Sequence, residues 1–231
     1  MFLRLSRIPY FTTLQKLTDR ITGTILERII SSFILVTTIR QKVFIGIDSS
    51  EFKPSQYYTE RSSSRLRKKW IKLSFGADML KQIICTIKIR RAPRRHDNID
   101  FQPIIIRTSE IRPLSIAVCD KGHDSEDNHV LVRESLKAYS IIHARYPHIP
   151  IWRTHVRYRK KMKRGYFKLL YNQRNKDETI MFVIKDSSLF GEHVTSRLVR
   201  TQNRELSLRC IAYNMHRVTN LFLLLMISTE P

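Results

Sequence analysis

The segment Val43-Phe-Ile-Gly-Ile-Asp48 is a short apolar run, rich in β-branched residues, that ends at a carboxylate. A run of this length and composition indicates a strand buried in the core of a sheet. Leu114–Cys119 is a second apolar run of the same kind, and Asp120 follows it directly. An aspartate at the mouth of a buried strand is held rigidly by the sheet and can still face solvent. The two runs therefore predict two rigidly held carboxylates.

Further strands and helices are predicted around these two runs. The expected strands cover residues 71–75 and 82–89. The expected helices cover residues 12–30, 125–139, 169–189 and 192–217, the last as one or two helices. Ser125 precedes acidic residues and suits the N-cap of its helix. Short buried strands that alternate with helices favour an α/β or mixed α+β body.

The chain carries a large excess of positive charge. Among its 231 residues, 42 are Lys or Arg and 20 are Asp or Glu, which gives a formal charge of +22. A compact body with this charge repels itself, so the excess indicates a polyanionic partner. Nucleic acid is the leading candidate, with ribosomal RNA and anionic membrane as rivals. The basic residues gather in residues 61–95 and 151–176, and the second tract contains no acid.

Other features of the composition narrow the class of protein. Hydrophobic residues make up 42% of the chain, which argues against wholesale disorder. Three widely spaced cysteines are typical of a reduced intracellular protein. Residues 29–47 are interrupted by Arg40 and Lys42, and residues 221–227 are too short to span a bilayer, so no membrane segment is expected. The histidines match no zinc spacing, and no Gly-rich phosphate loop is present.

The segment Tyr171-Asn-Gln-Arg174-Asn-Lys-Asp-Glu178-Thr-Ile-Met-Phe-Val-Ile-Lys185 has a regular polar spacing. In one helix, its four polar residues at offsets 0, 3, 7 and 14 would fall within an arc of roughly 60°. A carboxylate on that stripe could complete a metal site, and its basic side chains could bind phosphates. On spacing alone, a solvated helix face with an i,i+4 pair between Arg174 and Glu178 is the simpler interpretation.

Four residues of this segment, spaced Tyr-x2-Arg-x3-Glu-x6-Lys, resemble the signature of insertion-sequence DDE transposases of bacteria and archaea. Other landmarks of that family follow in the same order along roughly residues 40–217. The segment Ile47-Asp-Ser-Ser50 resembles the family's first-aspartate block. The segment Cys119-Asp-Lys-Gly-His-Asp-Ser125 resembles its second block. Smaller landmarks are His96-Asp97, Leu189-Phe-Gly-Glu192 and Tyr213-Asn214.

The resemblance implies a fold, a chemistry and a cofactor. The fold is an RNase H-like mixed sheet flanked by helices, with the two aspartates on neighbouring strands and the glutamate on a later helix. The chemistry is attack on DNA phosphodiesters by water and then by a 3′-hydroxyl. Two Mg²⁺ or Mn²⁺ ions would assist it. The implied metal ligands and catalytic residues are Asp48, Asp120 and Glu178.

The resemblance also implies a path for DNA across the protein. The residues expected to bind DNA are Tyr171, Arg174, Lys185, Arg67, Lys68, Lys69, Arg159, Lys160 and Lys161. The expected partners are the terminal inverted repeats of a transposon and the target DNA, with a homodimer assembled on them. The expected location is the cytoplasm or nucleoid of a prokaryotic cell.

Two departures from the family pattern stand out. His123 occupies the place of a usual tyrosine in the second block, and only 47 residues precede Asp48. We therefore expect residues 1–40 to form a short helical segment of a truncated DNA-binding region, residues 41–220 the catalytic domain and residues 221–231 a tail. The alternative functions are a non-catalytic DNA-binding remnant and a structural RNA-binding protein. A pure binder has no use for acids beside phosphate unless a cation intervenes.

Overall fold

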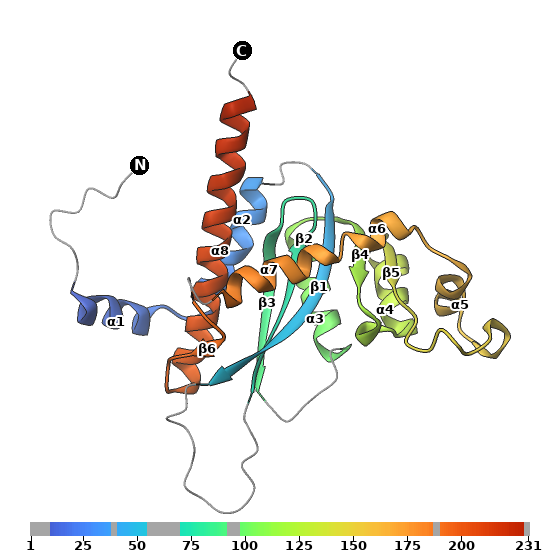
Figure 1. The fold of residues 1–231 in the computed structure, drawn as a ribbon, viewed down its shortest axis with the longest axis horizontal. Coiled ribbons are helices and arrows are strands. Elements are labelled where there is room, and N and C mark those ends of the chain that lie inside the picture. Colours follow the sequence, from blue (N-terminus) through green and yellow to red (C-terminus); the bar gives the residue numbers. More distant parts are fainter. Residues whose placement is uncertain (1–9, 38–40, 55–69, 92–97, 187–189, 229–231) are drawn as a thin grey trace, which may run out of the picture.

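The computed structural model describes residues 10–37, 41–54, 70–91, 98–186 and 190–228, and these are the residues discussed below. Their centre is a mixed sheet in the order β3-β2-β1-β4-β5, with β6 pairing to the end of β1 (Figure 1). The strands are β1 (Val43–Pro54), β2 (Ile71–Asp78), β3 (Ile83–Arg91), β4 (Leu114–Cys119), β5 (Tyr139–Ile142) and β6 (His193–Val194).

Strand direction divides the sheet into two parts. Strands β1, β2 and β3 are antiparallel neighbours, whereas β4 and β5 run parallel to β1. The predicted strands at residues 71–75 and 82–89 are confirmed as parts of β2 and β3, and Leu114–Cys119 is confirmed as β4. The mixed sheet flanked by helices is the RNase H-like arrangement that the resemblance implies.

Strand β1 is longer than its apolar run predicts. It continues through Asp48 to Pro54, because β2 goes on pairing with it from Asp48 opposite Phe75 to Phe52 opposite Ile71. The parallel partner β4 ends earlier, at Cys119 opposite Ile47. The expectation that β1 ends at Asp48 is therefore wrong, although Asp48 does lie where the parallel ladder ends.

The helix predicted over residues 125–139 is shorter than expected. Helix α4 (Glu126–Val130) and the π-helix η3 (Leu131–Ser135) occupy its first part, and Ser125 is the N-cap residue, without a side-chain cap bond. Lys137 then takes a positive φ of 52°, which ends the helical backbone. Residues from Tyr139 onward form β5, because they pair with β4.

Helices cover both faces of the sheet. The helices are α1 (Phe11–Arg20), α2 (Gly23–Thr37), α3 (Asn98–Ile111), α5 (Arg157–Arg164), α6 (Lys168–Asn172), α7 (Asn175–Lys185) and α8 (Val199–Ser228). The N-terminal segment is helical as expected, but it forms two helices, α1 and α2, rather than one. Thr22 separates them, and its hydroxyl accepts a hydrogen bond from the Ile25 N–H.

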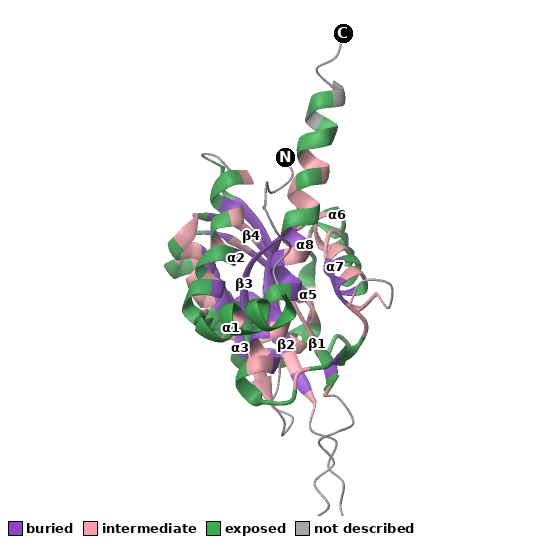
Figure 2. Ribbon diagram, turned by 90° about the vertical axis from the view of Figure 1, so that its left-hand side faces the viewer, coloured by how far each residue is buried: buried purple, intermediate pink, exposed green. Residues whose placement is uncertain are grey.

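Alternate residues of the central strands enter two separate cores. Phe44, Val118 and Ile141 pack with α7 and α8 on one face. Ile45, Cys119 and their neighbours pack with α3 on the other. Figure 2 shows these buried segments between the exposed outer faces of the helices.

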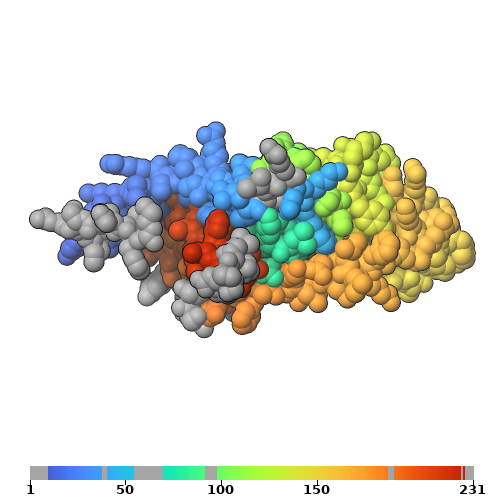
Figure 3. Space-filling model, turned by 90° about the horizontal axis from the view of Figure 1, so that it is seen from above, coloured from blue at the N-terminus to red at the C-terminus, as the bar shows by residue number. Residues whose placement is uncertain are grey.

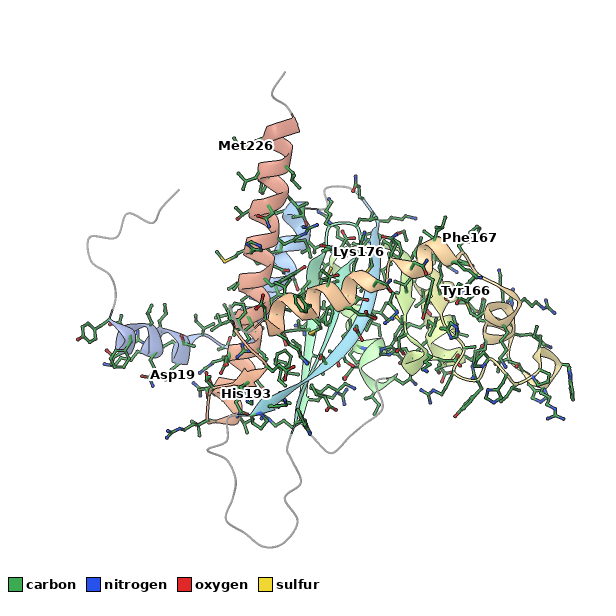
Figure 4. The ribbon with its side chains drawn as sticks, in the orientation of Figure 1. Asp19, Tyr166, Phe167, Lys176, His193 and Met226 are labelled. Atoms are coloured by element: carbon green, nitrogen blue, oxygen red, sulfur yellow. The ribbon has the colours of Figure 1, made fainter. Side chains whose placement is uncertain are left out.

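The prediction of one or two helices over residues 192–217 is confirmed from Val199 onward by the single long helix α8, whereas the first part of that range contains the short strand β6. The end of α8 projects from the body, where Phe222 and Met226 are exposed (Figure 4). In the parts of the chain that the structure describes, no helix has both the length and the apolar composition to cross a membrane.

Candidate active site

The two predicted aspartates lie on adjacent parallel strands. Ile47 of β1 pairs with Cys119 of β4, which in turn pairs with Ile142 of β5. The next residue on each strand is Asp48, Asp120 and His143. Side chains alternate along a strand, so these three follow the face of the sheet opposite to Ile47, Cys119 and Ile142. That face is the one covered by α7.

The Asp48 carboxylate is oriented by a neighbouring backbone N–H, and several nearby charges shift its pKa. The N–H of Ser49 donates to its Oδ1 at 2.8 Å. Burial raises the pKa of Asp48, and the negative charges of Asp120 and Glu178 add to that rise, while the Ser49 hydrogen bond and Arg174 oppose it. The sheet and the signature segment therefore bring these charged groups within electrostatic reach of one another.

Asp120 lies where β4 passes into the 3₁₀-helix η2 (Lys121–His123). Its Oδ1 accepts a short hydrogen bond from the Gly122 N–H, so the carboxylate caps η2. His123 is buried against Phe101, with ring centroids 5.7 Å apart, and burial lowers its pKa from 6.5 to about 4. The histidine that departs from the family pattern is therefore a neutral packing residue at neutral pH.

Glu178 lies on the solvent side of α7. Its side chain is 61% exposed and accepts from Arg174 at 2.8 Å, as the simpler interpretation of the spacing predicts. Burial by itself would lower the pKa of Arg174, but Tyr171, Glu178 and Asp48 raise it, so Arg174 stays charged. Among the described residues, no three His, Cys, Asp or Glu side chains are grouped closely enough to form a ready metal-binding cluster.

The signature segment is not the single straight helix that its spacing predicts. It divides into α6 and α7, with a tighter turn between them in which the Arg174 N–H donates to Tyr171 O and the Asp177 N–H to Arg174 O. Tyr171 therefore lies on a different helix from Glu178. Lys185 lies beyond the acids, with its Nζ 5.2 Å from the ring centre of Phe52, four residues past Asp48 on β1.

An aromatic cluster borders the acids. The ring centres of His143, Tyr166 and Tyr171 lie 5.2 to 6.1 Å apart. Burial raises the pKa of Tyr171, and Asp120 contributes to the rise, so this tyrosine neighbours the carboxylates. In the sequence, His143 follows an apolar run just as the two aspartates do. It was missed because no strand was predicted after the helix that was expected to end at Tyr139.

Asp177 is the second residue that sequence reasoning missed. Its side chain is 0% exposed, and burial raises its pKa well above the ordinary value, with a further contribution from Asp48. The buried side of α7 consists of Asp177, Ile180, Met181 and Ile184. These residues have helical spacing, so the sequence did carry the signal that Asp177, rather than Glu178, faces the core.

The predicted basic residues lie in different environments. Arg159 of α5 makes two hydrogen bonds of 2.8 Å to Asp124, whose side chain is 1% exposed. Lys160 is half-buried and Lys161 is exposed on the same helix. The lobe that holds α5 forms one end of the elongated body, opposite to α1 (Figure 3). The predicted DNA-binding residues Arg67, Lys68 and Lys69 lie outside the described residues.

The chain is similar to solved structures and to one protein family. Two solved structures align with 93% of the chain: the Mos1 strand transfer complex, at 14% identity and a TM-score of 0.32, and the Mos1 transposase paired-end complex with left transposon end, at 15% and 0.31. The chain covers 66% and 67% of those chains, respectively. No curated protein matches the sequence significantly. The family model described as "Transposase DDE domain" matches residues 39–215, and the chain therefore belongs to the DDE-domain transposase family.

Proposed function

We propose that this chain is a transposase that cleaves DNA strands and transfers them to a new site, with Asp48, Asp120 and Glu178 as the catalytic carboxylates. The observation that carries the proposal is the strand register, which places Asp48 and Asp120 on neighbouring strands at the end of the parallel ladder. Glu178 comes from the helix on the same face, and its charge acts on Asp48. These observations support a site to which residues far apart in the sequence contribute.

The three carboxylates suit divalent cations. Members of this family use divalent metal ions, and carboxylate oxygens are the hard ligands that Mg²⁺ and Mn²⁺ prefer. Two such ions, when bound, activate the attacking hydroxyl and stabilise the leaving oxygen. Asp48 and Asp120 would hold them from the sheet, each oriented by a backbone N–H, from Ser49 and Gly122 respectively. Glu178 would bind the ions after its ion pair with Arg174 is broken.

The basic and aromatic side chains around the acids would hold the DNA. Arg174, once released from Glu178, would pair with a phosphate. Tyr171 would contact a nucleotide beside Asp120. Lys185, at the end of α7, would contact the phosphate backbone of the DNA farther along β1. Exposed lysines such as Lys161 would extend this path over the α5 lobe. Arg67, Lys68 and Lys69, which lie outside the described residues, are proposed as further DNA-binding residues.

The complete reaction of such an enzyme requires more than this site. We infer that the substrates are the terminal inverted repeats of a transposon and a target DNA, and that two copies of the chain assemble on them. The corresponding place in the cell is the nucleoid of a prokaryote. These assignments extend the family relationship and the charge of +22.

Nicking of supercoiled plasmid in Mn²⁺ tests the catalytic assignment. The purified protein is compared with Glu178→Gln and with Glu110→Gln, a matched control at an exposed position on α3, on the other face of the sheet. We expect metal-dependent nicking by the wild type and the control, and its loss in Glu178→Gln. Equal nicking by all three proteins would indicate a contaminating nuclease and contradict the assignment.

A second candidate function is DNA binding without catalysis. The pairing of Glu178 with Arg174 favours it, because that ion pair gives the carboxylate a partner within the chain. On this alternative, none of the three proteins nicks DNA in Mn²⁺, although all three still bind it. The same experiment therefore separates the two candidates.

A further inference from the structure

Asp177 is a buried carboxylate that the three-acid site does not use. It points from α7 toward the sheet, and neither Oδ1 nor Oδ2 has a hydrogen-bond partner within the described part of the chain. The neighbouring Lys176, labelled in Figure 4, makes no hydrogen bond to it, and its Nζ donates instead to the carbonyl of Met79 at 2.9 Å. The charged form of a carboxylate buried without a partner is costly, and a bound cation would offset that cost.

The sheet is shaped to admit this carboxylate. A Cβ atom added to Gly46 would lie 2.4 Å from Oδ2 of Asp177 and 2.6 Å from Sδ of Met79. Only a residue without a side chain therefore leaves room at this point of β1. The acid group lies directly against the strand that carries Asp48.

Asp177 and Asp48 lie near the same region of that face. Gly46 and Asp48 are two residues apart on β1, so they point to the same side and are separated by about 7 Å. The negative charge of Asp48 acts on Asp177. Glu178, the next residue on α7, lies about 100° further around the helix, where it is exposed. The helix thus offers two carboxylates to the site, one from the core and one from solvent.

We propose that Asp177 is a further ligand of the cation site and binds, from the core side, the same Mg²⁺ or Mn²⁺ ion as Asp48. This inference rests on the proposed function, because it requires that the site bind a divalent cation. The cation would give both orphaned oxygens of Asp177 a partner and would offset the repulsion between the two acids.

Binding of Mn²⁺, measured by the loss of the free-ion electron paramagnetic resonance signal, tests the inference without relying on activity. The proteins compared are the wild type, Asp48→Asn, Asp177→Asn and the control Glu110→Gln. We expect Asp48→Asn and Asp177→Asn each to weaken Mn²⁺ binding by about tenfold or more, as loss of a ligand does, and the control to bind like the wild type. Asp177→Asn should still fold, since without metal it loses only an unpartnered buried acid.

Replacing Asp177 by cysteine tests whether residue 177 binds the ion directly or only acts on it as a distant charge. Asp177→Cys should bind Mn²⁺ as weakly as Asp177→Asn, because a thiolate is a poor ligand for a hard cation. It should bind Cd²⁺ more tightly than Asp177→Asn does, because cadmium prefers sulfur. Equal Cd²⁺ affinity in these two variants would overturn direct binding by residue 177.

The outcomes also separate this inference from the proposed function. If Asp48→Asn loses Mn²⁺ while Asp177→Asn retains wild-type affinity, the cation site stands and the role of Asp177 is overturned. If the wild type binds no Mn²⁺, the cation site itself is overturned, and the role of Asp177 with it. Weakened binding in both variants, with Cd²⁺ rescue by Asp177→Cys, supports both.

Discussion

Ile47 pairs with Cys119 in the last step of the parallel ladder between β1 and β4, and each strand continues directly into an aspartate. Cys119 also pairs with Ile142, and His143 follows that residue. Two acids and a histidine are therefore aligned across three strands, on the face covered by α7. This alignment depends on pairing between segments that lie tens of residues apart in the sequence.

Substitutions of Asp120 should separate its role in catalysis from its role in the fold. Asp120→Asn retains an oxygen that can accept the Gly122 N–H, so we expect an intact fold and a loss of Mn²⁺-dependent nicking of at least about 100-fold. Asp120→Ala removes the cap as well, and should lower the free energy of unfolding by about 1 kcal/mol. Urea unfolding and plasmid nicking measure the two effects. Full nicking by the asparagine variant would exclude Asp120 as a metal ligand.

The contact between Gly46 and Asp177 should appear as a coupling energy. Gly46→Ala forces a methyl group against the Asp177 carboxylate and Met79, and we expect it to destabilise the fold by about 1–3 kcal/mol. In an Asp177→Ala background the same substitution should cost clearly less, because one of the obstructing groups is gone. Urea unfolding of the four proteins in this double-mutant cycle gives the coupling. Additive effects would contradict the close approach of α7 to β1.

Arg159 and Lys161 should respond differently to replacement by alanine, although both belong to α5. Arg159→Ala leaves Asp124 buried without its counter-charge and should destabilise the protein by roughly 2–4 kcal/mol. Lys161→Ala should leave stability within about 0.5 kcal/mol, because the side chain is exposed. If Lys161 contacts a phosphate, DNA affinity should fall and the slope of log K against log salt should decrease by about one. Fluorescence anisotropy at several KCl concentrations measures that slope, and an unchanged slope would place Lys161 outside the DNA path.

Acid should destabilise the fold through its buried histidines. Burial lowers the pKa of His123 and of His129 from 6.5 to about 4. Between these values the unfolded chain binds more protons than the folded chain, so stability falls as the pH drops from 6.5 to 4. The full effect is up to about 3 kcal/mol for each histidine.

The raised pKa of Asp177 acts in the opposite direction, so the histidine effect is best measured as a difference. His123→Phe keeps the contact with Phe101 but cannot be protonated. Unfolding of this variant should therefore depend less on pH than unfolding of the wild type over the same range. Equal pH dependence would show that His123 is not buried as a neutral ring.

The parts of the fold that were predicted correctly are those that a short stretch of sequence indicates by its own composition. The strand Leu114–Cys119 is an apolar, β-branched run with a polar residue after it, and such a run has few alternatives to a buried strand. Strand β5 was missed because its apolar run, Ile141-Ile142, is only two residues long. The four residues of β5 form a strand only because β4 offers a parallel edge beside them. The break between α6 and α7 was missed for a similar reason, since no Gly or Pro marks it in the sequence.

The sequence by itself determined the kinds of residue available to this protein: a basic surface, two aspartates after apolar runs, and a helical segment with Arg174 and Glu178. These features depend on composition and short-range spacing, which one chain displays directly. The tertiary structure alone decided that Asp48, Asp120 and His143 share one row and that Asp177 lies against Gly46 of β1. Strand register and the docking of α7 on the sheet are set by pairing and packing between distant segments, and no local pattern specifies them.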